Sequence, residues 1–233
     1  DDEYNILVLE NLGAASDFTF IYQPGQQLSE TDALTLTAFI SDLHNQFATR
    51  TPDPAFANQS MRVLNHEHIF NYPFLGDNGF DLDTVQPGLQ ELAMPYKRDA
   101  ELKSIMKQLG EVYVANVESG KSVTLLHGDY YPGSWLQTAS GTKIIDPEFC
   151  FYGPAEFDLG VMMAHLMMAE QPPTVLNTVL TNYQPADGFD DSLRRRFTGV
   201  EIMRRLIGLA QLPLNLSLET KRDLLGEAYS LLI

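Results

Sequence analysis

The sequence is short of positive charge. It holds 15 lysines and arginines against 31 aspartates and glutamates, which gives a formal net charge of −16. Proteins that bind nucleic acid or an anionic membrane neutralise phosphate groups with lysine and arginine. The balance therefore argues against both kinds of partner. It also means that an anionic ligand would have to be held by a metal ion and a few local cations.

Cysteine and long apolar runs are scarce as well. The one cysteine, Cys150, excludes an internal disulfide and fits a reducing compartment. We find no signal peptide and no uninterrupted apolar run long enough to cross a bilayer. The sequence therefore predicts a cytoplasmic protein that neither spans nor binds a membrane.

The apolar content is that of a globular protein. With 233 residues and 44% hydrophobic residues, the chain can form one large domain or two small ones around a sizeable core. Apolar periodicity predicts helices over residues 29–48, 89–115 (bent or restarted around Met94-Pro95) and 192–212. The run at 161–170 is apolar on all sides, which is typical of a buried helix. We expect an α+β fold that is mainly α.

Two short runs of β type, at 135–138 and 143–145, predict a hairpin. Gly141 lies between them and can supply the left-handed residue of a three-residue loop. In that register Ser134 lies opposite Asp146. The hairpin would then bring the segment before its first strand close to the segment after its second.

Those two segments carry acidic residues. The first is His127-Gly128-Asp129 and the second is Asp146-Pro147-Glu148. Carboxylate oxygens gathered in this way can hold a hydrated Mg²⁺ that also binds phosphates. Transfer of a phosphoryl group to an alcohol further needs a proton acceptor apart from the metal. We assign that role to Asp129, assign Asp146 and Glu148 as metal ligands, and expect the Ser134 hydroxyl to add a ligand oxygen.

Structural alternatives exist for the same residues. An aspartate after His-Gly is also common in turns, but its spacing from the second acidic segment favours catalysis. His127 is a catalytic candidate or, alternatively, a buried imidazole that braces the loop. Asp158 is expected to bond loop amides or to cap the helix that follows.

Together, His-Gly-Asp at 127–129 and Ile-Asp at 145–146 resemble the phosphotransferase branch of the protein-kinase-like fold, which includes aminoglycoside and choline kinases. Within it, the chain is most similar to the 5-methylthioribose kinase family, from about Leu7 to the arginines near 204. The motifs that carry this likeness are Gly133-Ser134, the DPEF-x-FYGP segment at 146–154 with FD-x-G at 157–160, and LNHEHIF at 64–70.

The resemblance implies a kinase that uses ATP and Mg²⁺ to phosphorylate a hydroxyl of a small sugar-like molecule, 5-methylthioribose or a relative. It implies that residues 1–13 form the last strand of an N-terminal lobe and the hinge, and that 14–233 form the C-terminal lobe. Glu10, Asn11 and Leu12 would then meet the adenine. An edge strand followed by a turn fits the same residues equally well.

The resemblance also suggests substrate contacts. Arg204 and Arg205 lie close to the buried face of their predicted helix, and members of this family carry such a pair near the substrate and the transferring phosphate. Tyr130, Tyr131 and Pro132 stand where the family has Leu-His-Thr, beside the expected acceptor hydroxyl. We take both tyrosines as candidate substrate contacts. Another alcohol, such as an aminoglycoside, homoserine or choline, remains open as the acceptor.

Parts of such a kinase have no counterpart here. The sequence has no glycine-rich phosphate loop, and it lacks the strand lysine and helix glutamate that position nucleotide phosphates. We therefore expect a C-terminal lobe whose N-terminal lobe was removed or is encoded elsewhere, and which alone transfers no phosphate. The alternative is a non-catalytic lobe that binds a ligand or partner. A homodimer is left open.

Overall fold

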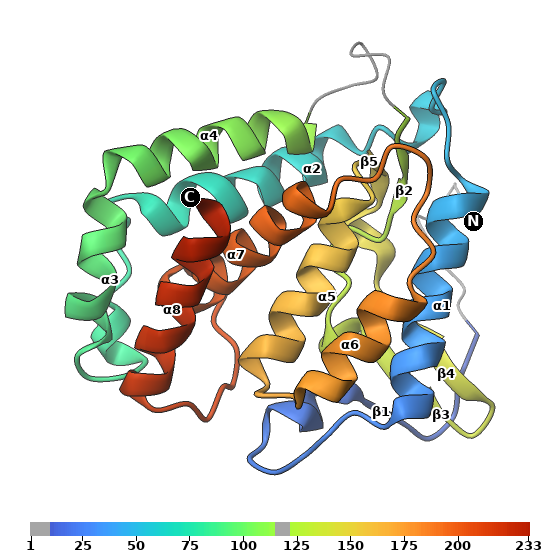
Figure 1. Cartoon of the computed structure of the whole chain (residues 1–233), viewed down its shortest axis with the longest axis horizontal. Helices are drawn as coiled ribbons and strands as arrows, with labels where there is room; N and C mark the ends of the chain where they lie inside the picture. Colours follow the sequence, from blue (N-terminus) through green and yellow to red (C-terminus); the bar gives the residue numbers. More distant parts are fainter. Residues whose placement is uncertain (1–9, 115–121) are drawn as a thin grey trace, which may run out of the picture.

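The computed structural model describes residues 10–114 and 122–233, and they form a mainly helical lobe with two small sheets (Figure 1). The predicted strand at 6–9 lies outside the described residues. The helices are α1 Glu30–Gln46, α2 Gln59–His66, α3 Leu89–Arg98, α4 Ala100–Val114, α5 Glu156–Met168, α6 Pro173–Asn182, α7 Asp191–Ile207 and α8 Leu218–Leu232. The strands are β1 Ala15–Asp17, β2 Thr124–Leu126, β3 Trp135–Thr138, β4 Gly141–Ile144 and β5 Phe151–Gly153. The expected α+β, mainly α, fold is confirmed.

Both sheets are antiparallel and small. One has the order β1-β3-β4, and the other pairs β2 with β5. The predicted hairpin is β3-β4, but its predicted register is wrong by one residue. Thr138 pairs with Gly141, so the loop holds two residues. The Thr138 hydroxyl donates to the Gly141 carbonyl at 2.7 Å and so closes the shorter loop. Ser134 consequently faces Ile145, whose amide donates to the Ser134 carbonyl at 3.0 Å, and not Asp146.

Helix starts and ends follow local capping. Ser29 caps α1 by accepting the Asp32 amide at 3.1 Å. The predicted break near Met94-Pro95 lies further along, because Pro95 is accommodated inside α3. The chain restarts at Asp99, whose side chain accepts the Leu102 amide of α4 at 2.9 Å.

Two predicted helices, α5 and α7, are present in the structure with somewhat different bounds. The run at 161–170 begins inside α5, which is buried on nearly all sides, as predicted, and its last two residues lie past the end of the helix at Met168. The helix predicted over 192–212 is α7 and ends earlier, at Ile207. Gly208 has a ψ of −171°, which takes the backbone out of the helix.

The lobe is organised around α5, which lies beside α7 and α6 in Figure 1. Val161 and Ala164 of α5 enter an apolar cluster with α3, α4, α7 and α8. Met162 and Leu166 enter a second cluster with α1, α6 and the hairpin. Helix α5 therefore packs against both apolar clusters of the core.

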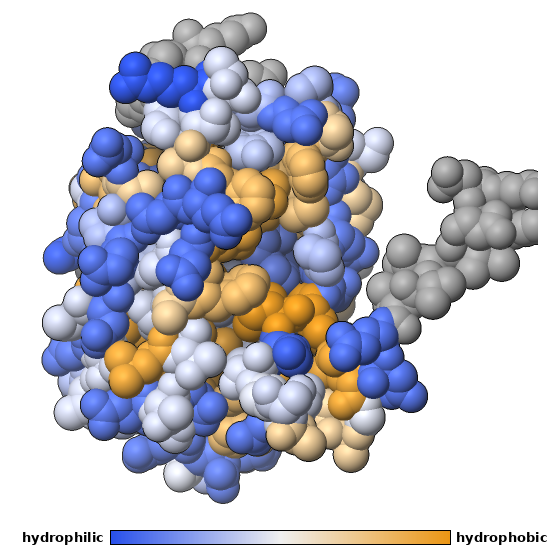
Figure 2. Space-filling view, turned by 90° about the vertical axis from the view of Figure 1, so that its right-hand side faces the viewer, coloured by the Kyte–Doolittle hydropathy of each residue, from blue (hydrophilic) through white to orange (hydrophobic). Residues whose placement is uncertain are grey.

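The outer surface shows no single large apolar face on the side of α1. Figure 2 shows apolar and hydrophilic residues interspersed there. Leu34 and Phe39 are exposed large apolar residues of α1. None of the helices in the described ranges, 10–114 and 122–233, is long and apolar enough to span a bilayer.

Candidate active site

The His-Gly-Asp loop leaves the end of β2 and is held by a carboxylate from the start of α5. Asp158 accepts the amides of His127 at 2.7 Å and Gly128 at 3.0 Å, which confirms its predicted role. Burial alone would raise the pKa of Asp158, but the hydrogen bond and charge of His44 and the His127 amide lower it overall. Asp158 is therefore a buried anion that fixes the loop backbone.

The loop also lies directly against the second acidic segment. Gly128 has a φ of +85°, and a Cβ there would lie 2.2 Å from the carbonyl oxygen of Phe149. Only glycine fits both the conformation and the space. His127 Nε2 donates to the carbonyl of Ile145 at 2.9 Å, and its Nδ1 faces the Asp129 amide at 3.4 Å. These contacts show the bracing arrangement; a catalytic role for His127 stays a prediction.

Two arginines of α7 converge on Asp129. The Asp129 side chain is partly buried, and its Oδ1 lies 3.1 Å from Arg205 Nη2 and 3.5 Å from Arg204 Nη2. Both guanidinium groups are buried, and Arg205 lies over the ring of Tyr131, 5.0 Å from its centroid. The structure thus brings together four of the predicted site residues, from two segments far apart in the sequence.

Asn65 joins the same cluster. Its Nδ2 donates to the Gly128 carbonyl at 3.2 Å, and its Oδ1 accepts from Arg204 Nη1 at 3.3 Å. The side chain is buried and thereby ties α2 to both the loop and α7. Sequence analysis singled out the segment around Asn65 but not this residue.

The predicted metal ligands lie in the turn that follows β4. Asp146 and Glu148 are exposed, and neither carboxylate makes a hydrogen bond or ion pair with another described residue. Asp146 has a φ of 65° and a ψ of 54°, a left-handed conformation uncommon for residues other than glycine. Backbone strain of this kind often accompanies a functional site.

The ligand set is incomplete as it stands. Across residues 10–114 and 122–233, no group of three histidine, cysteine, aspartate or glutamate side chains is placed to hold a metal ion. Two free carboxylates fit part of the octahedral shell of Mg²⁺, which usually keeps waters and binds substrate phosphates. The Ser134 hydroxyl is buried and donates to the Asp129 carbonyl at 2.9 Å. Metal ligation by Asp146, Glu148 and Ser134 stays a prediction.

The backbone of the second acidic segment is held by a side chain that the sequence analysis did not identify. Asn58, at the start of α2, donates through Nδ2 to the carbonyls of Glu148 at 2.7 Å and Cys150 at 2.9 Å. Asn58 has a φ of 39°, which asparagine tolerates better than most residues. The turn that carries Asp146 and Glu148 is therefore fixed from outside.

Replacing Asn58 by aspartate is expected to destabilise the lobe by about 1–3 kcal/mol. The change keeps shape and backbone preference, but two carbonyls lose their donor and face a carboxylate. Urea unfolding measures the loss. Asn182→Asp is the control, because Asn182 makes a similar side-chain bond to a carbonyl on the exposed surface of α6. Equal effects of the two substitutions would contradict the anchoring role.

Two other groups of predicted site residues lie elsewhere. The Tyr130 side chain is fully buried, donates to the Leu36 carbonyl at 2.9 Å and packs on Trp135, so its predicted substrate contact is not supported. Glu10 and Asn11 are exposed and Leu12 is half-buried, just before β1. Their contact with adenine stays a prediction.

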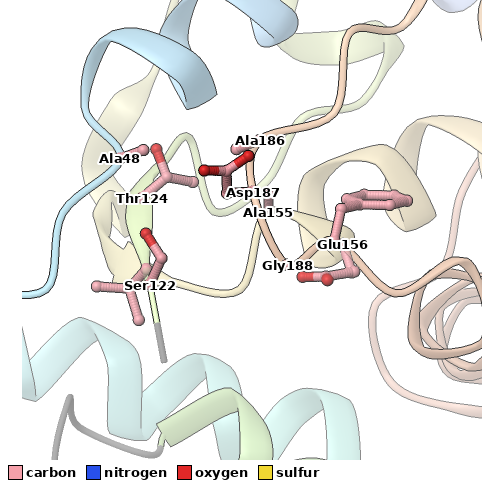
Figure 3. A pocket seen from close by; sticks show the side chains of 10 residues that line it. Ala48, Ser122, Thr124, Ala155, Glu156, Ala186, Asp187 and Gly188 are labelled. Atoms are coloured by element: carbon pink, nitrogen blue, oxygen red, sulfur yellow. The ribbon is translucent and has the colours of Figure 1, made fainter. Parts of the chain in front are cut away.

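A separate small cavity opens at the start of β2 (Figure 3). It has a volume of about 30 Å³ and is lined by residues that include Thr124, Glu156 and Asp187. None of the predicted site residues lines it. The candidate site is therefore the surface around Asp129 and not this cavity.

Comparison with known proteins shows the family to which the chain belongs. A model of the phosphotransferase enzyme family (APH) matches residues 22–197. A methylthioribose kinase of Exiguobacterium sibiricum is 31% identical over 189 residues, which cover 66% of this chain and 46% of that protein. A methylthioribose kinase of Geobacillus kaustophilus is 30% identical over 200 residues, which cover 71% of this chain and 48% of that protein. The chain spans about half the length of these curated relatives.

Solved structures of small-molecule kinases also align with most of the chain. A choline kinase from Streptococcus pneumoniae gives a TM-score of 0.48 at 12% identity, covering 96% of this chain and 68% of that one. A glucosamine kinase gives a TM-score of 0.49 at 16% identity, and the alignment covers 93% of this chain and 58% of that one. The family model covers more than half of the sequence, from before α1 into α7. The chain therefore belongs to the phosphotransferase enzyme family.

Proposed function

We propose that the chain is the catalytic lobe of a small-molecule kinase that transfers the γ-phosphoryl group of MgATP to a hydroxyl of a sugar-like acceptor. The first candidate acceptor is 5-methylthioribose or a relative, because the two curated relatives named above are methylthioribose kinases. The observation that carries the proposal is the placement of Asp129. Its carboxylate stands on a loop whose backbone is held by Asp158, and it pairs with two buried arginines.

This arrangement suits phosphoryl transfer to an alcohol. Asp129 accepts a hydrogen bond from the acceptor hydroxyl and orients it, which is the role of a general base in this chemistry. Arg204 and Arg205 place two positive charges beside that carboxylate, where negative charge on the transferring group would gather. Tyr131, half-buried beneath Arg205, forms an apolar wall for the acceptor.

The metal and the nucleotide phosphates would bind at the exposed acidic turn after β4. Asp146 and Glu148 would hold Mg²⁺, with Ser134 as a further oxygen near it. Bound Mg²⁺ neutralises phosphate charge. Glu10, Asn11 and Leu12 would meet the adenine. The remaining positive charge for the phosphates would come from an N-terminal lobe acting as partner, since this chain carries a net charge of −16.

The test is phosphate transfer from labelled ATP, measured for this chain and for a protein that joins it to an N-terminal lobe of the family. The acceptors are 5-methylthioribose, an aminoglycoside, homoserine and choline. We expect transfer to 5-methylthioribose or a related sugar by the two-lobe protein only. Equal turnover by the chain alone would refute the need for the N-terminal lobe. No transfer by a folded two-lobe protein to any acceptor would refute the kinase assignment.

A second test concerns the metal. We expect Mg²⁺ to bind weakly alone and more tightly with nucleotide, because two carboxylates fill only part of its shell. The double substitution Asp146→Asn, Glu148→Gln should lower the MgATP affinity of the two-lobe protein in calorimetry. Asp81→Asn, Asp83→Asn in an exposed turn is the matched control. Unchanged MgATP affinity in the first double variant would remove the metal assignment.

A further inference from the structure

Glu201 lies behind the arginine pair, on the same face of α7. It precedes Arg204 by three residues and Arg205 by four, which puts all three side chains together on the helix. The Glu201 side chain is 1% exposed. Its Oε1 accepts from Arg205 Nε at 2.7 Å, and its Oε2 lies 3.2 Å from Arg204 Nε. A carboxylate with this little water depends on such partners to stay ionised.

The two arginines contact the same two carboxylates. Each turns Nε inward to Glu201 and Nη2 outward to Asp129. The two guanidinium groups thus bridge a buried and a partly exposed carboxylate, and the four charges cancel. Burial and the charge of Arg205 lower the pKa of Arg204, and the charge of Glu201 opposes this by raising it.

Glu201 is itself oriented by a second layer of hydrogen bonds. His165 of α5 lies with Nε2 2.9 Å from Glu201 Oε1, and the Tyr22 hydroxyl lies 2.6 Å from His165 Nδ1. An ionised carboxylate only accepts hydrogen bonds, so Nε2 carries the proton and Tyr22 donates to Nδ1. Burial lowers the pKa of His165 to about 4, which keeps the imidazole neutral at pH 7. The hydrogen bonds therefore run in one direction, from Tyr22 to His165 to Glu201.

We propose that Glu201, oriented by His165 and Tyr22, is a positioning residue that aims Arg204 and Arg205 at Asp129. The role of this arrangement in catalysis rests on the proposed function, whereas the contacts among these residues are independent of it. Glu201 holds Arg205 Nε by a hydrogen bond and Arg204 Nε by an ion pair, and the Nη2 atoms are thereby set at the loop before any ligand arrives. Such preorganised charge requires no rearrangement when the transferring group becomes more negative.

The first test is Glu201→Gln in the full chain, followed by NMR of the arginine Nε–Hε groups. Arg204→Lys and Arg205→Lys assign the two signals. We expect solvent exchange of the Arg205 Hε to speed up by about tenfold or more, the scale of one charge-assisted hydrogen bond. Glu156→Gln is the matched control, because Glu156 is also buried and accepts the Asp190 amide at the start of the same helix. It should leave both signals unchanged.

Unchanged arginine signals in a folded Glu201→Gln variant would overturn the proposal. If that variant does not fold, the same NMR measurement on Tyr22→Phe tests the proposal, since this substitution removes one hydroxyl and leaves the charged cluster intact. We expect it to shift the His165 ring nitrogens and, less strongly, the Arg205 Nε signal. No change at either position would overturn the proposal.

Steady-state kinetics distinguish a positioning role of Glu201 from a role in stability alone. In the two-lobe protein, Glu201→Gln should lower kcat and leave the KM for ATP unchanged, and Glu156→Gln should change neither. An unchanged kcat in the folded Glu201 variant would overturn the proposal. Loss of all turnover in the unsubstituted two-lobe protein would refute the proposed function instead, and the NMR arm would still decide the role of Glu201.

Discussion

Replacing Asp129 by asparagine in the two-lobe protein is expected to lower kcat by about 10²- to 10⁴-fold, the range for general acid–base groups. This corresponds to roughly 2.7–5.5 kcal/mol of transition-state stabilisation. Asparagine keeps the shape of the side chain and its contact with the arginines, but it cannot accept the hydroxyl proton. The KM for ATP should barely change, because the expected metal ligands are Asp146 and Glu148.

The measurement is steady-state phosphate transfer with both substrates varied. Asp187→Asn serves as the control, because Asp187 lies at the small cavity of Figure 3 and not at the loop. Thermal unfolding of both variants shows whether the lobe remains folded. A folded Asp129→Asn variant that turns over within roughly threefold of the unsubstituted protein would make Asp129 a structural residue.

The second large effect is expected on stability below neutral pH. His165 is fully buried, and burial lowers its pKa from 6.5 to about 4. The unfolded chain therefore binds a proton at this residue at a higher pH than the folded chain does. Stability from this group is complete above pH 6.5 and is lost as the pH falls from 6.5 towards 4. A shift of this size corresponds to roughly 3 kcal/mol at about 1.36 kcal/mol per pKa unit.

Urea unfolding between pH 7 and pH 4 measures this loss. Glu201 and Asp158 also have lowered pKa values, so acid removes their contribution at pH values below the ordinary carboxyl range. His165→Gln keeps a donor for Glu201 and should flatten the pH dependence between 6.5 and 4. His66→Gln, at a partly exposed histidine, should leave it unchanged. An identical pH slope in His165→Gln and the unsubstituted chain would contradict the prediction.

The sequence predicted those features that depend on neighbours along the chain. The hairpin followed from two β-type runs around a turn, and the buried helix α5 from an all-apolar run. Asp158 was predicted to bond the loop because its motif placed it at a helix start. The register of the hairpin was missed by one residue, because two-residue and three-residue loops fit the same glycine and the observed two-residue loop is closed by a side-chain bond from Thr138 to the Gly141 carbonyl.

Features that depend on distant partners were not predictable in this way. Asn65 meets Gly128 and Arg204, which are 63 and 139 residues away. No periodicity indicates such a meeting. Tyr130 and Tyr131 are adjacent, and only the fold shows that Tyr130 points into the core. Glu201 is different, because its spacing from the arginine pair was visible as a helical pattern and could have been predicted from it.

The hydrogen bonds from His127 and Gly128 to Asp158 have a consequence for local motion. Their acceptor begins α5, the helix that belongs to both apolar clusters of the core. Loops on a protein surface usually exchange their amide hydrogens through small local openings. Because Asp158 is fully buried in α5, we expect these two amides to be released mainly when the packing of α5 is disrupted, that is, in a cooperative opening of the lobe. We therefore expect the segment that carries the catalytic candidate Asp129 to exchange its bonded amides as slowly as the core does.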